Sequence, residues 1–578
     1  TIMALLRSES PNVAIKEVDL SGIVPGVTTS TGAIVGNFAW GPVNTPVLVG
    51  NEGELVSNFG DPSFSTDANA IEFLSANQFL KYSNSLYVVR GATSAAKNAV
   101  DSGSTVDLIS NRDDWDNSKS TAVGNFIAKY AGDAGNSLSV SVCGSRDSAW
   151  NGWAYSGAFD AKPGTSDYVS TRSVDGAAAL DEVHVAIVDE DGTFSGTPNT
   201  ILETFANVSL ASDAKTSDGA KNYILDVLDD RSSYVWGANK PGVYGAATTA
   251  AAFTNTSHGA DQTTSPKTGS LAYGVNSGVL GTAEFSTAHD QFEDENTIQI
   301  DMLIAPSLSS GTDQATVVND LVATATERKD CVVVTSPNRA AVVGVNDPST
   351  VITNIITTAA TFTKSSYLVV DNNYLKVYDK YNDKYTFIPA ASSTAGLMAS
   401  TDDVAAPWFS PAGTRRGNYL GVTSIAYNAT RSQRDTLYKA GVNPIANLPG
   451  QGITLQGDKT FLGKPSAFDR INVRRLFLVL ERAIKGAAQN VLFEFNDEFS
   501  RAEFVNIVEP FLREVQGRRG ITDFRVVCDE TNNTGQIIDT NSFVASIFVK
   551  PARSINYVTL NFVAVRTGVD FEEVVGAV

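Results

Sequence analysis

The sequence predicts a multidomain chain of the α/β and α+β classes, with a mostly β insertion in its middle and extended arms at both ends. A chain of 578 residues is too long for one hydrophobic core, and an apolar content of 42% can fill several. Alternating strand and helix patterns flank a central region rich in Gly, Ala, Ser, Thr and Asp. Residues 1–22 form a weakly patterned run before Pro25, which is typical of an arm.

These patterns divide the chain into six segments. They are an N-terminal linking arm at 1–22, the first part of an inner α/β domain at 23–92, a mostly β insertion at 93–290, the second part of the inner domain at 291–455, a C-terminal domain at 456–568 and a C-terminal arm at 569–578.

The first part of the inner domain begins with strands. The apolar run at 31–36 predicts one strand, and the run at 41–49 predicts a second after a turn. Two helical patterns follow, and the run at 85–90 predicts a third strand.

The insertion has short strands in which apolar and polar residues alternate. Clear examples are 138–142 and 183–188. Asp191 and Gly192 follow the second of these, and this dipeptide predicts a tight hairpin turn.

Strands and helices alternate again in the second part of the inner domain. We expect a strand at 297–306, a helix at 315–328 and a buried strand at 331–335. A strand, a crossover helix and a further strand make a parallel unit with a right-handed connection.

The C-terminal domain begins with an amphipathic helix at 469–487. Arg475 and Arg482 fall opposite its apolar stripe, so they form either an ordinary solvated face or a basic docking face. The stripe consists of Val473, Phe477, Leu480 and Ile484.

A second helix is expected to start at Ser500, where Glu503 completes a capping box. Pro510 predicts a kink or a break within it. Arg518 and Arg519 stand at its end, where positive charge is favourable.

The domain closes with strands at 524–528, 543–549 and 555–565, the last with a half-buried alternation. A small sheet with open edges invites added strands, and the two arms can supply them to neighbouring copies. The candidate residues for strands between subunits are Val13, Ile15, Val18, Val558, Leu560, Phe562, Val569 and Phe571.

Charge and cysteine content exclude several classes of protein. The net charge of −20 argues against nucleic-acid binding, because phosphate neutralisation requires Lys and Arg. Residues 456–578 hold 15 basic and 16 acidic side chains, so the negative charge falls almost entirely on 1–455. The three cysteines are widely spaced, as is typical of a reducing compartment. Residues 1–20 lack a signal-peptide pattern, and no apolar run is long enough to span a membrane. Together these features predict a protein that is made in, and stays in, the cytoplasm.

The sequence contains no recognisable catalytic motif. Residues 452–460 come close to a phosphate-binding loop, but Asp458 stands where the lysine is required. The acids at 189–191 lack the other ligands of a calcium loop, and His184, His258 and His289 fall in no hydrolase motif. We therefore expect no catalytic residue, cofactor or metal site, although a pair of carboxylates would leave no local signature.

Three blocks near the C-terminus carry a family resemblance. They are the segments 468–476, 526–533 and 551–562, and in this order they resemble the tail sheath proteins of contractile-tail bacteriophages of the T-even type. The resemblance implies a C-terminal sheath core of α/β type, an outward-facing insertion, and arms that complete the C-terminal sheet of adjacent subunits.

The same resemblance implies partners and a location. These are a helical polymer of sheath subunits, the tail tube protein, and baseplate and tail terminator proteins, with no nucleic acid and no membrane insertion. The protein would belong to the virion tail and be assembled in the host cytoplasm. The candidates for a tube-facing basic surface are Arg475, Arg482, Lys485, Arg518 and Arg519.

Two other functions remain open from the sequence. One is the sheath of a related contractile injection system, such as a bacteriocin or a secretion system. The other is an acidic, β-rich surface adhesin, which fits the composition of 93–290 but not the missing signal sequence.

Overall fold

The structure, a computed structural model, describes residues 30–62, 67–101, 106–118, 124–171, 181–238 and 265–556. The described residues form two compact units. The larger is made from 30–407 and 411–485, and the smaller from 408–410 and 486–556. The predicted C-terminal domain at 456–568 is thus divided between the units. Both predicted arms, with all eight candidate strand residues, lie outside the described residues.

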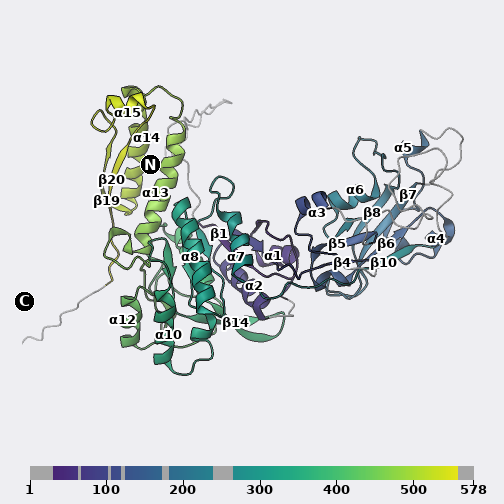
Figure 1. The fold of residues 1–578 in the computed structure, drawn as a ribbon, viewed down its shortest axis with the longest axis horizontal. Helices are drawn as coiled ribbons and strands as arrows, with labels where there is room; N and C mark the ends of the chain where they lie inside the picture. Colours follow the sequence, from purple (N-terminus) through teal and green to yellow (C-terminus); the bar gives the residue numbers. More distant parts are fainter. Residues whose placement is uncertain are drawn as a thin grey trace, which may run out of the picture. The chain divides into compact units, whose positions relative to one another are not determined.

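A six-stranded sheet forms the core of the α/β part of the larger unit, around the strand labelled β1 in Figure 1. Its strands, in spatial order, are β13 (Leu368–Val370), β12 (Val332–Thr335), β11 (Met302–Ile304), β1 (Gly32–Gly36), β3 (Leu86–Arg90) and β2 (Val47–Val49). Neighbours are parallel except β2, which runs antiparallel to β3. The strands are nearly continuous apolar runs because both faces of the sheet are buried.

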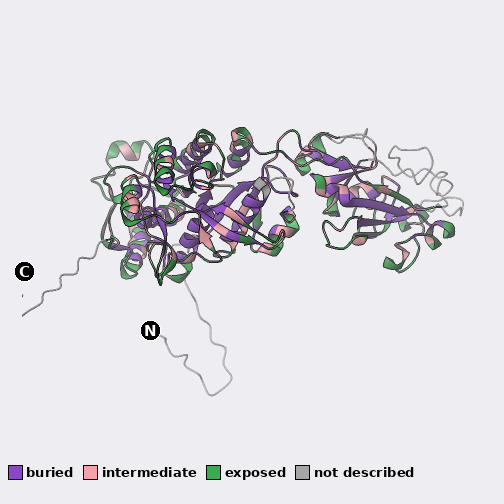
Figure 2. Ribbon diagram, turned by 90° about the horizontal axis from the view of Figure 1, so that it is seen from below, coloured by how far each residue is buried: buried purple, intermediate pink, exposed green. Residues whose placement is uncertain are grey.

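Helices cover both faces of this sheet. On one face Ala33 and Val35 pack among residues of α7 (Thr282–His289), α8 (Gly311–Arg328) and α10 (Pro348–Ala360). On the other face Ile34 packs among residues of α1 (Glu52–Phe59), α2 (Asp67–Leu80), α11 (Ala391–Val404) and α13 (Ile471–Gln489). Figure 2 shows the central strands as buried and the outer sides of the helices as exposed. The predicted parallel unit β11–α8–β12 is confirmed.

Smaller elements complete the α/β part of this unit. A three-stranded sheet contains β15, β14 and β16, and β17 pairs with β18. Their bounds, with those of the remaining helices, are β14 (Tyr374–Asp379), β15 (Lys384–Pro389), β16 (Ser424–Ile425), β17 (Ile445–Leu448), β18 (Gly452–Leu455), α9 (Arg339–Val342) and α12 (Arg431–Lys439).

The insertion consists of two antiparallel sheets, as its alternating patterns predict. One sheet has the order β4 (Asn98–Val100), β5 (Phe126–Ala131), β9 (Val235–Gly237). The other has the order β10 (Lys267–Ser270), β6 (Leu138–Cys143), β7 (Glu182–Asp189), β8 (Thr200–Ser209). Its described helices are α3 (Arg112–Ser118), α4 (Asp147–Asn151), α5 (Asp167–Ser170) and α6 (Ile224–Arg231). Helix α7 also lies within the predicted span 93–290, but it packs on the six-stranded sheet.

The tight turn predicted at Asp191 and Gly192 is wrong. The connection between β7 and β8 runs from 190 to 199. Its first half is organised by the Asp189 carboxylate, which accepts hydrogen bonds from four successive backbone N–H groups, those of residues 192–195, at 2.8–3.1 Å. Burial acts to raise the pKa of Asp189, but the hydrogen bonds from the Ser137 hydroxyl and from this shell outweigh burial and hold the pKa below its usual value.

The smaller unit packs a hairpin on a long helix. Its elements are α14 (Glu498–Gly517), β19 (Ile521–Val527), α15 (Gly535–Asp539) and β20 (Ser546–Pro551). The N-cap of α14 is Asp497, which accepts from the Ser500 backbone N–H, so the start predicted at Ser500 is wrong by one turn. Pro510 lies inside α14, and the break allowed for there does not occur.

Candidate functional site

Two arginines that lie two turns apart on α13, the buried Arg475 and the half-buried Arg482, attach this helix to the rest of the larger unit. Arg475 donates to both carboxylate oxygens of Asp402 in α11, at 2.7 and 2.5 Å, and to the Met398 carbonyl at 3.0 Å. The Arg475 and Asp402 side chains are 4% and 5% exposed. A bidentate pair of this kind fixes orientation as well as distance.

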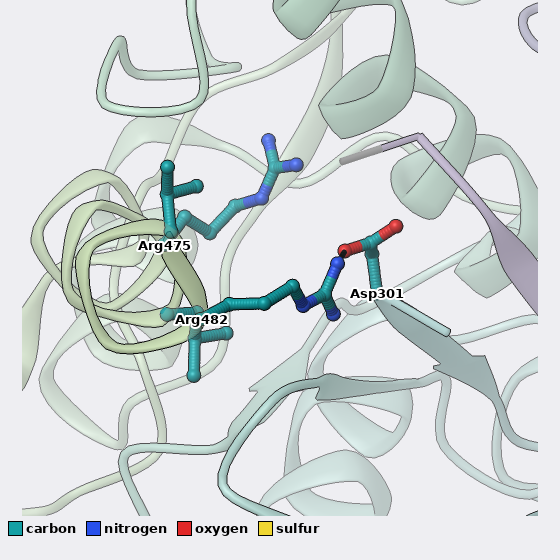
Figure 3. A pocket seen from close by; sticks show the side chains of 5 residues that line it. Asp301, Arg475 and Arg482 are labelled. Atoms are coloured by element: carbon teal, nitrogen blue, oxygen red, sulfur yellow. Dashed lines mark hydrogen bonds and ion pairs between the residues drawn. The ribbon is translucent and has the colours of Figure 1, made fainter. Parts of the chain in front are cut away.

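Arg482 forms the second attachment, at the start of β11. Its guanidinium donates to Asp301 at 2.6 Å and to the carbonyls of Ile300 and Asp330, both at 2.9 Å. Figure 3 shows the Arg475 and Arg482 side chains extending from α13, with the Arg482 guanidinium at the Asp301 carboxylate. Burial raises the pKa of Asp301 to about 6, although Arg482 and the Thr31 backbone N–H both oppose that shift.

The space between these side chains cannot hold a ligand. It is lined by Asp301, Arg475, Leu478, Val479 and Arg482 and has a volume of about 10 Å³. That is no more than the room for one water molecule. The cluster therefore connects parts of one subunit.

The expectation that Arg475 and Arg482 lie on an exposed face is wrong. Both are placed opposite carboxylates that are 73 and 181 residues away in the sequence. Helical periodicity reports only which residues share a face, and here the polar face is buried as well.

Arg474, which precedes the first of these arginines, is a further buried residue of this cluster that was not predicted from the sequence. Its guanidinium lies over the rings of Tyr367 and Phe468, 4.3 and 4.2 Å from their centroids, and donates to Ser366 at 3.0 Å. Burial lowers its pKa. A run of two arginines at the start of an otherwise apolar helix was the available signal.

The remaining basic candidates lie on the surface. Lys485 pairs with Glu295, and its side chain is 56% exposed. Arg518 and Arg519 follow the C-terminal end of α14, where Arg518 lies over the Trp408 ring at 5.1 Å and 3.7 Å from Glu514. Arg519 has a φ of 66°, in the left-handed region.

The hairpin of β19 and β20 forms a two-stranded sheet. Its antiparallel register runs from Val527 opposite Ser546 to Ile521 opposite Pro551, with an irregularity between Ile521 and Asp523. Within the described residues no third strand pairs with it, so both outer edges present unpaired backbone groups there. The strand predicted at 555–565 lies mostly outside the described residues.

The histidines in the described residues lie in packed positions. His184 Nε2 is 2.7 Å from the Ala161 carbonyl, and its Nδ1 accepts from the Asn207 backbone N–H at 3.0 Å. His289 is buried beside Phe285, and burial lowers its pKa to about 4. His258 lies outside the described residues.

The near match to a phosphate-binding loop at 452–460 has the wrong structure. Residues Gly452–Leu455 form β18, and Asp458 pairs with Arg470 at 2.9 Å.

Cys143 and Cys331 are buried and Cys528 is half-buried, all as free thiols. Among the described residues we find no group of three His, Cys, Asp or Glu side chains suited to a metal ion, and no helix with the length and hydropathy of a membrane span.

Comparison with known proteins decides the family. Residues 29–90 match the tail sheath protein Gp18 domain III N-terminal region, residues 278–461 the phage tail sheath protein central domain, and residues 463–564 the phage tail sheath C-terminal domain. The chain is 31% identical to the tail sheath protein of Vibrio phage KVP40, over 98% of this chain and 99% of that protein. The chain belongs to the phage tail sheath protein family.

Further relatives and a solved structure agree with this. The tail sheath proteins of Salmonella phage ViI and Enterobacteria phage T4 are 32% and 31% identical over 98% of this chain, and over 98% and 99% of their own lengths. The crystal structure of the sheath tail protein of Listeria innocua has a TM-score of 0.53 and 13% identity, over 92% of this chain and 95% of that chain. At that identity the likeness shows the fold, which confirms the predicted mixed α/β class.

The family places the features described above. In this sheath family member, the C-terminal domain match begins just before α13 and contains the buried arginines, α14 and the hairpin. The insertion falls between the matches to 29–90 and 278–461.

Proposed function

We propose that this chain is the repeating subunit of a contractile tail sheath, which polymerises helically around a tail tube and contracts to drive that tube through the host cell envelope during genome delivery. The proposal is carried by the sequence identity of 31–32% to phage tail sheath proteins, which extends over 98% of this chain. The role is mechanical, with no enzymatic step and no cofactor.

The hairpin of β19 and β20 supplies the link between subunits. A strand added at either edge would bond to backbone groups that have no strand partner within the described residues. About five such bonds, at roughly 0.5–1.5 kcal/mol each, contribute several kcal/mol before side-chain packing. The donors in this proposal are the arms at 1–22 and 569–578, with Val13, Ile15, Val18, Val569 and Phe571. The other three candidates, Val558, Leu560 and Phe562, belong to the strand predicted at 555–565 of the C-terminal domain.

Links of this kind produce an open polymer. The donor arm and the acceptor hairpin are different surfaces of one subunit, so the contact is heterologous and need not close into a dimer. A polymer joined through chain segments can change its pitch and radius while each link persists. That property is what contraction requires.

The tube contact in this proposal uses basic side chains that the structure leaves on the surface. Lys485 on α13, and separately Arg518 and Arg519 after α14, meet this condition. Arg475 and Arg482 do not, because their guanidinium groups are used inside the subunit. A tube surface that receives these bases should be acidic.

The proposed sheath subunit has protein partners and a place in the virion. The subunit assembles in the host cytoplasm with copies of itself, the tail tube protein, and baseplate and tail terminator proteins, and becomes part of the virion tail. It needs neither nucleic acid nor membrane insertion. The excess of acidic side chains suits a protein that must stay soluble at high local concentration.

Electron microscopy of the purified chain tests the proposal. We expect long hollow cylinders in negative stain, and sheathed tubes when the cognate tube protein is added. A chain that stays monomeric at all concentrations, with and without tubes, would contradict it. The sheath of another contractile injection system is the related alternative, and preferential assembly on a bacteriocin or secretion-system tube would favour it.

A further inference from the structure

An exposed aromatic loop joins α13 to α14. Leu492, Phe493, Phe495 and Phe499 expose between 62% and 106% of their surface. Large apolar side chains gathered in this way mark a contact surface, because a soluble protein gains nothing by leaving them in water.

Hydrogen bonds hold the loop, whereas its aromatic side chains are exposed. The Asn496 side chain donates to the Ser542 carbonyl at 2.8 Å, and Arg501 donates to the Asn496 side chain at 3.1 Å. Phe493 has a φ of 72°, a left-handed conformation that a bulky residue adopts only at a cost in free energy. The chain therefore presents a fixed, strained aromatic surface.

Negative charge surrounds these rings. Glu494, Asp497 and Glu498 are exposed within the loop or next to it, and no Lys or Arg occurs between Lys485 and Arg501. A partner surface should thus be apolar at its centre and basic at its rim.

The outer face of the hairpin in the same unit has that character. Phe524 and Val526 are half-buried on the side toward α14, whereas Arg525 and Phe548 form an exposed cross-strand pair on the other side. Phe548 is 61% exposed. The charged side chains on the two strands are Arg525, Lys550 and Asp523, which leaves the strands with a net charge of +1.

We propose that the aromatic loop at 490–499 of one copy docks on the outer face of the β19–β20 hairpin of a second copy. This inference rests on the proposed polymerisation and adds a face contact to the strand links at the hairpin edges. Loop and face are different surfaces of one unit, so their contact is also heterologous and propagates in an open series.

Two sets of substitutions test this contact, in chains polymerised without tube protein. Phe493→Ser with Phe495→Ser should raise the concentration needed for polymerisation about tenfold or more, because it removes the apolar centre. Glu494→Lys with Glu498→Lys, and separately Arg525→Glu with Lys550→Glu, should have the same direction of effect. All four charge reversals in one chain should restore assembly to within about threefold of the wild type.

Controls separate docking from folding. Val404→Ser, at an exposed apolar residue of the larger unit, should leave polymerisation unchanged. Phe493→Gly removes the ring and relieves the strained φ, so its melting temperature should not fall while its assembly weakens.

Three outcomes would overturn the inference. They are normal polymerisation of the double serine variant, no rescue in the fourfold charge variant, and a serine variant that polymerises alone but fails to cover purified tubes, since the loop would then bind the tube. A wild-type chain that forms no polymer contradicts the proposed function instead.

Discussion

Arg475 on α13 and Asp402 on α11 form a bidentate ion pair that is almost fully buried, with donor–acceptor distances of 2.7 and 2.5 Å. This pair and the Arg482–Asp301 pair fix α13 to the rest of the larger unit at two points two turns apart. Arg475 and Arg482 thus attach α13 to other parts of the same subunit.

Arg475→Met should destabilise the unassembled chain by about 3–5 kcal/mol, because the Asp402 carboxylate stays buried without its partner. Chemical denaturation measures this loss. Arg475→Met with Asp402→Leu should recover most of it, since an apolar pair of similar volume can replace a buried ion pair. Lys485→Met is the control, and its exposed pair should contribute less than about 1 kcal/mol. An Arg475→Met chain that unfolds at the wild-type denaturant concentration would refute this role.

Glu72 should make the stability fall as the pH rises. It is fully buried on α2, accepts from the Asn37 backbone N–H, and burial raises its pKa to about 8. Because the folded pKa lies above the unfolded value, the contribution of the protonated form is complete below about pH 4.5 and is lost as the pH rises through 8, with a slope of about 1.4 kcal/mol per pH unit.

Glu72→Gln imitates the protonated carboxyl and should remove that slope. Thermal unfolding at pH 5 to 8.5 should show the variant gaining on the wild type as the pH increases. Glu327→Gln, at an exposed position of α8, should show no such gain. Equal slopes for Glu72→Gln and the wild type would mean that Glu72 is not protonated in the folded chain.

Local patterns in the sequence were sufficient to predict many of the strands and helices. The β11–α8–β12 unit is confirmed because each element buries its own apolar residues and the connection has one favoured hand. The alternating strands β6 and β7 are also confirmed, because each of them buries its own apolar residues. Short elements were less accurate, as at β11, where only Met302–Ile304 of the predicted strand at 297–306 pairs.

The errors arose where a partner distant in the sequence, or a competing local hydrogen-bond pattern, decides the outcome. Arg475 and Arg482 were placed in solvent because their carboxylate partners lie 73 and 181 residues away. The Asp189 carboxylate organises the loop after β7, which the dipeptide Asp191–Gly192 did not reveal. The start of α14 was missed because both Asp497 and Ser500 are good N-caps.

Trp408 should be essential for the smaller unit. It is buried, donates from its indole N–H to the Arg518 carbonyl at 3.1 Å, and packs against Gly520, where an added Cβ would lie 2.6 Å from Val515 and 3.2 Å from the Trp408 ring. Trp408→Ala should cost about 3–5 kcal/mol. Limited proteolysis should then cut within 486–556 first, whereas equal protection of that region in variant and wild type would contradict this assignment.

Hydrogen exchange should detect the open edges of the hairpin. In an antiparallel pair the N–H groups of each strand point alternately toward and away from the partner. In the monomer the outward N–H groups of β19 and β20 should therefore exchange rapidly, and in the polymer they should become protected. A peptide containing β12 is the control, because that strand has neighbours on both sides. Unchanged exchange at the hairpin after polymerisation would exclude strand addition there.

The most direct test of strand addition between subunits compares the full chain with a chain that lacks residues 1–22 and 569–578. Both are viewed by electron microscopy at matched concentration. We predict hollow cylinders from the full chain and folded monomers, with an unchanged circular dichroism spectrum, from the shortened one. Ordered cylinders from the shortened chain would contradict the account.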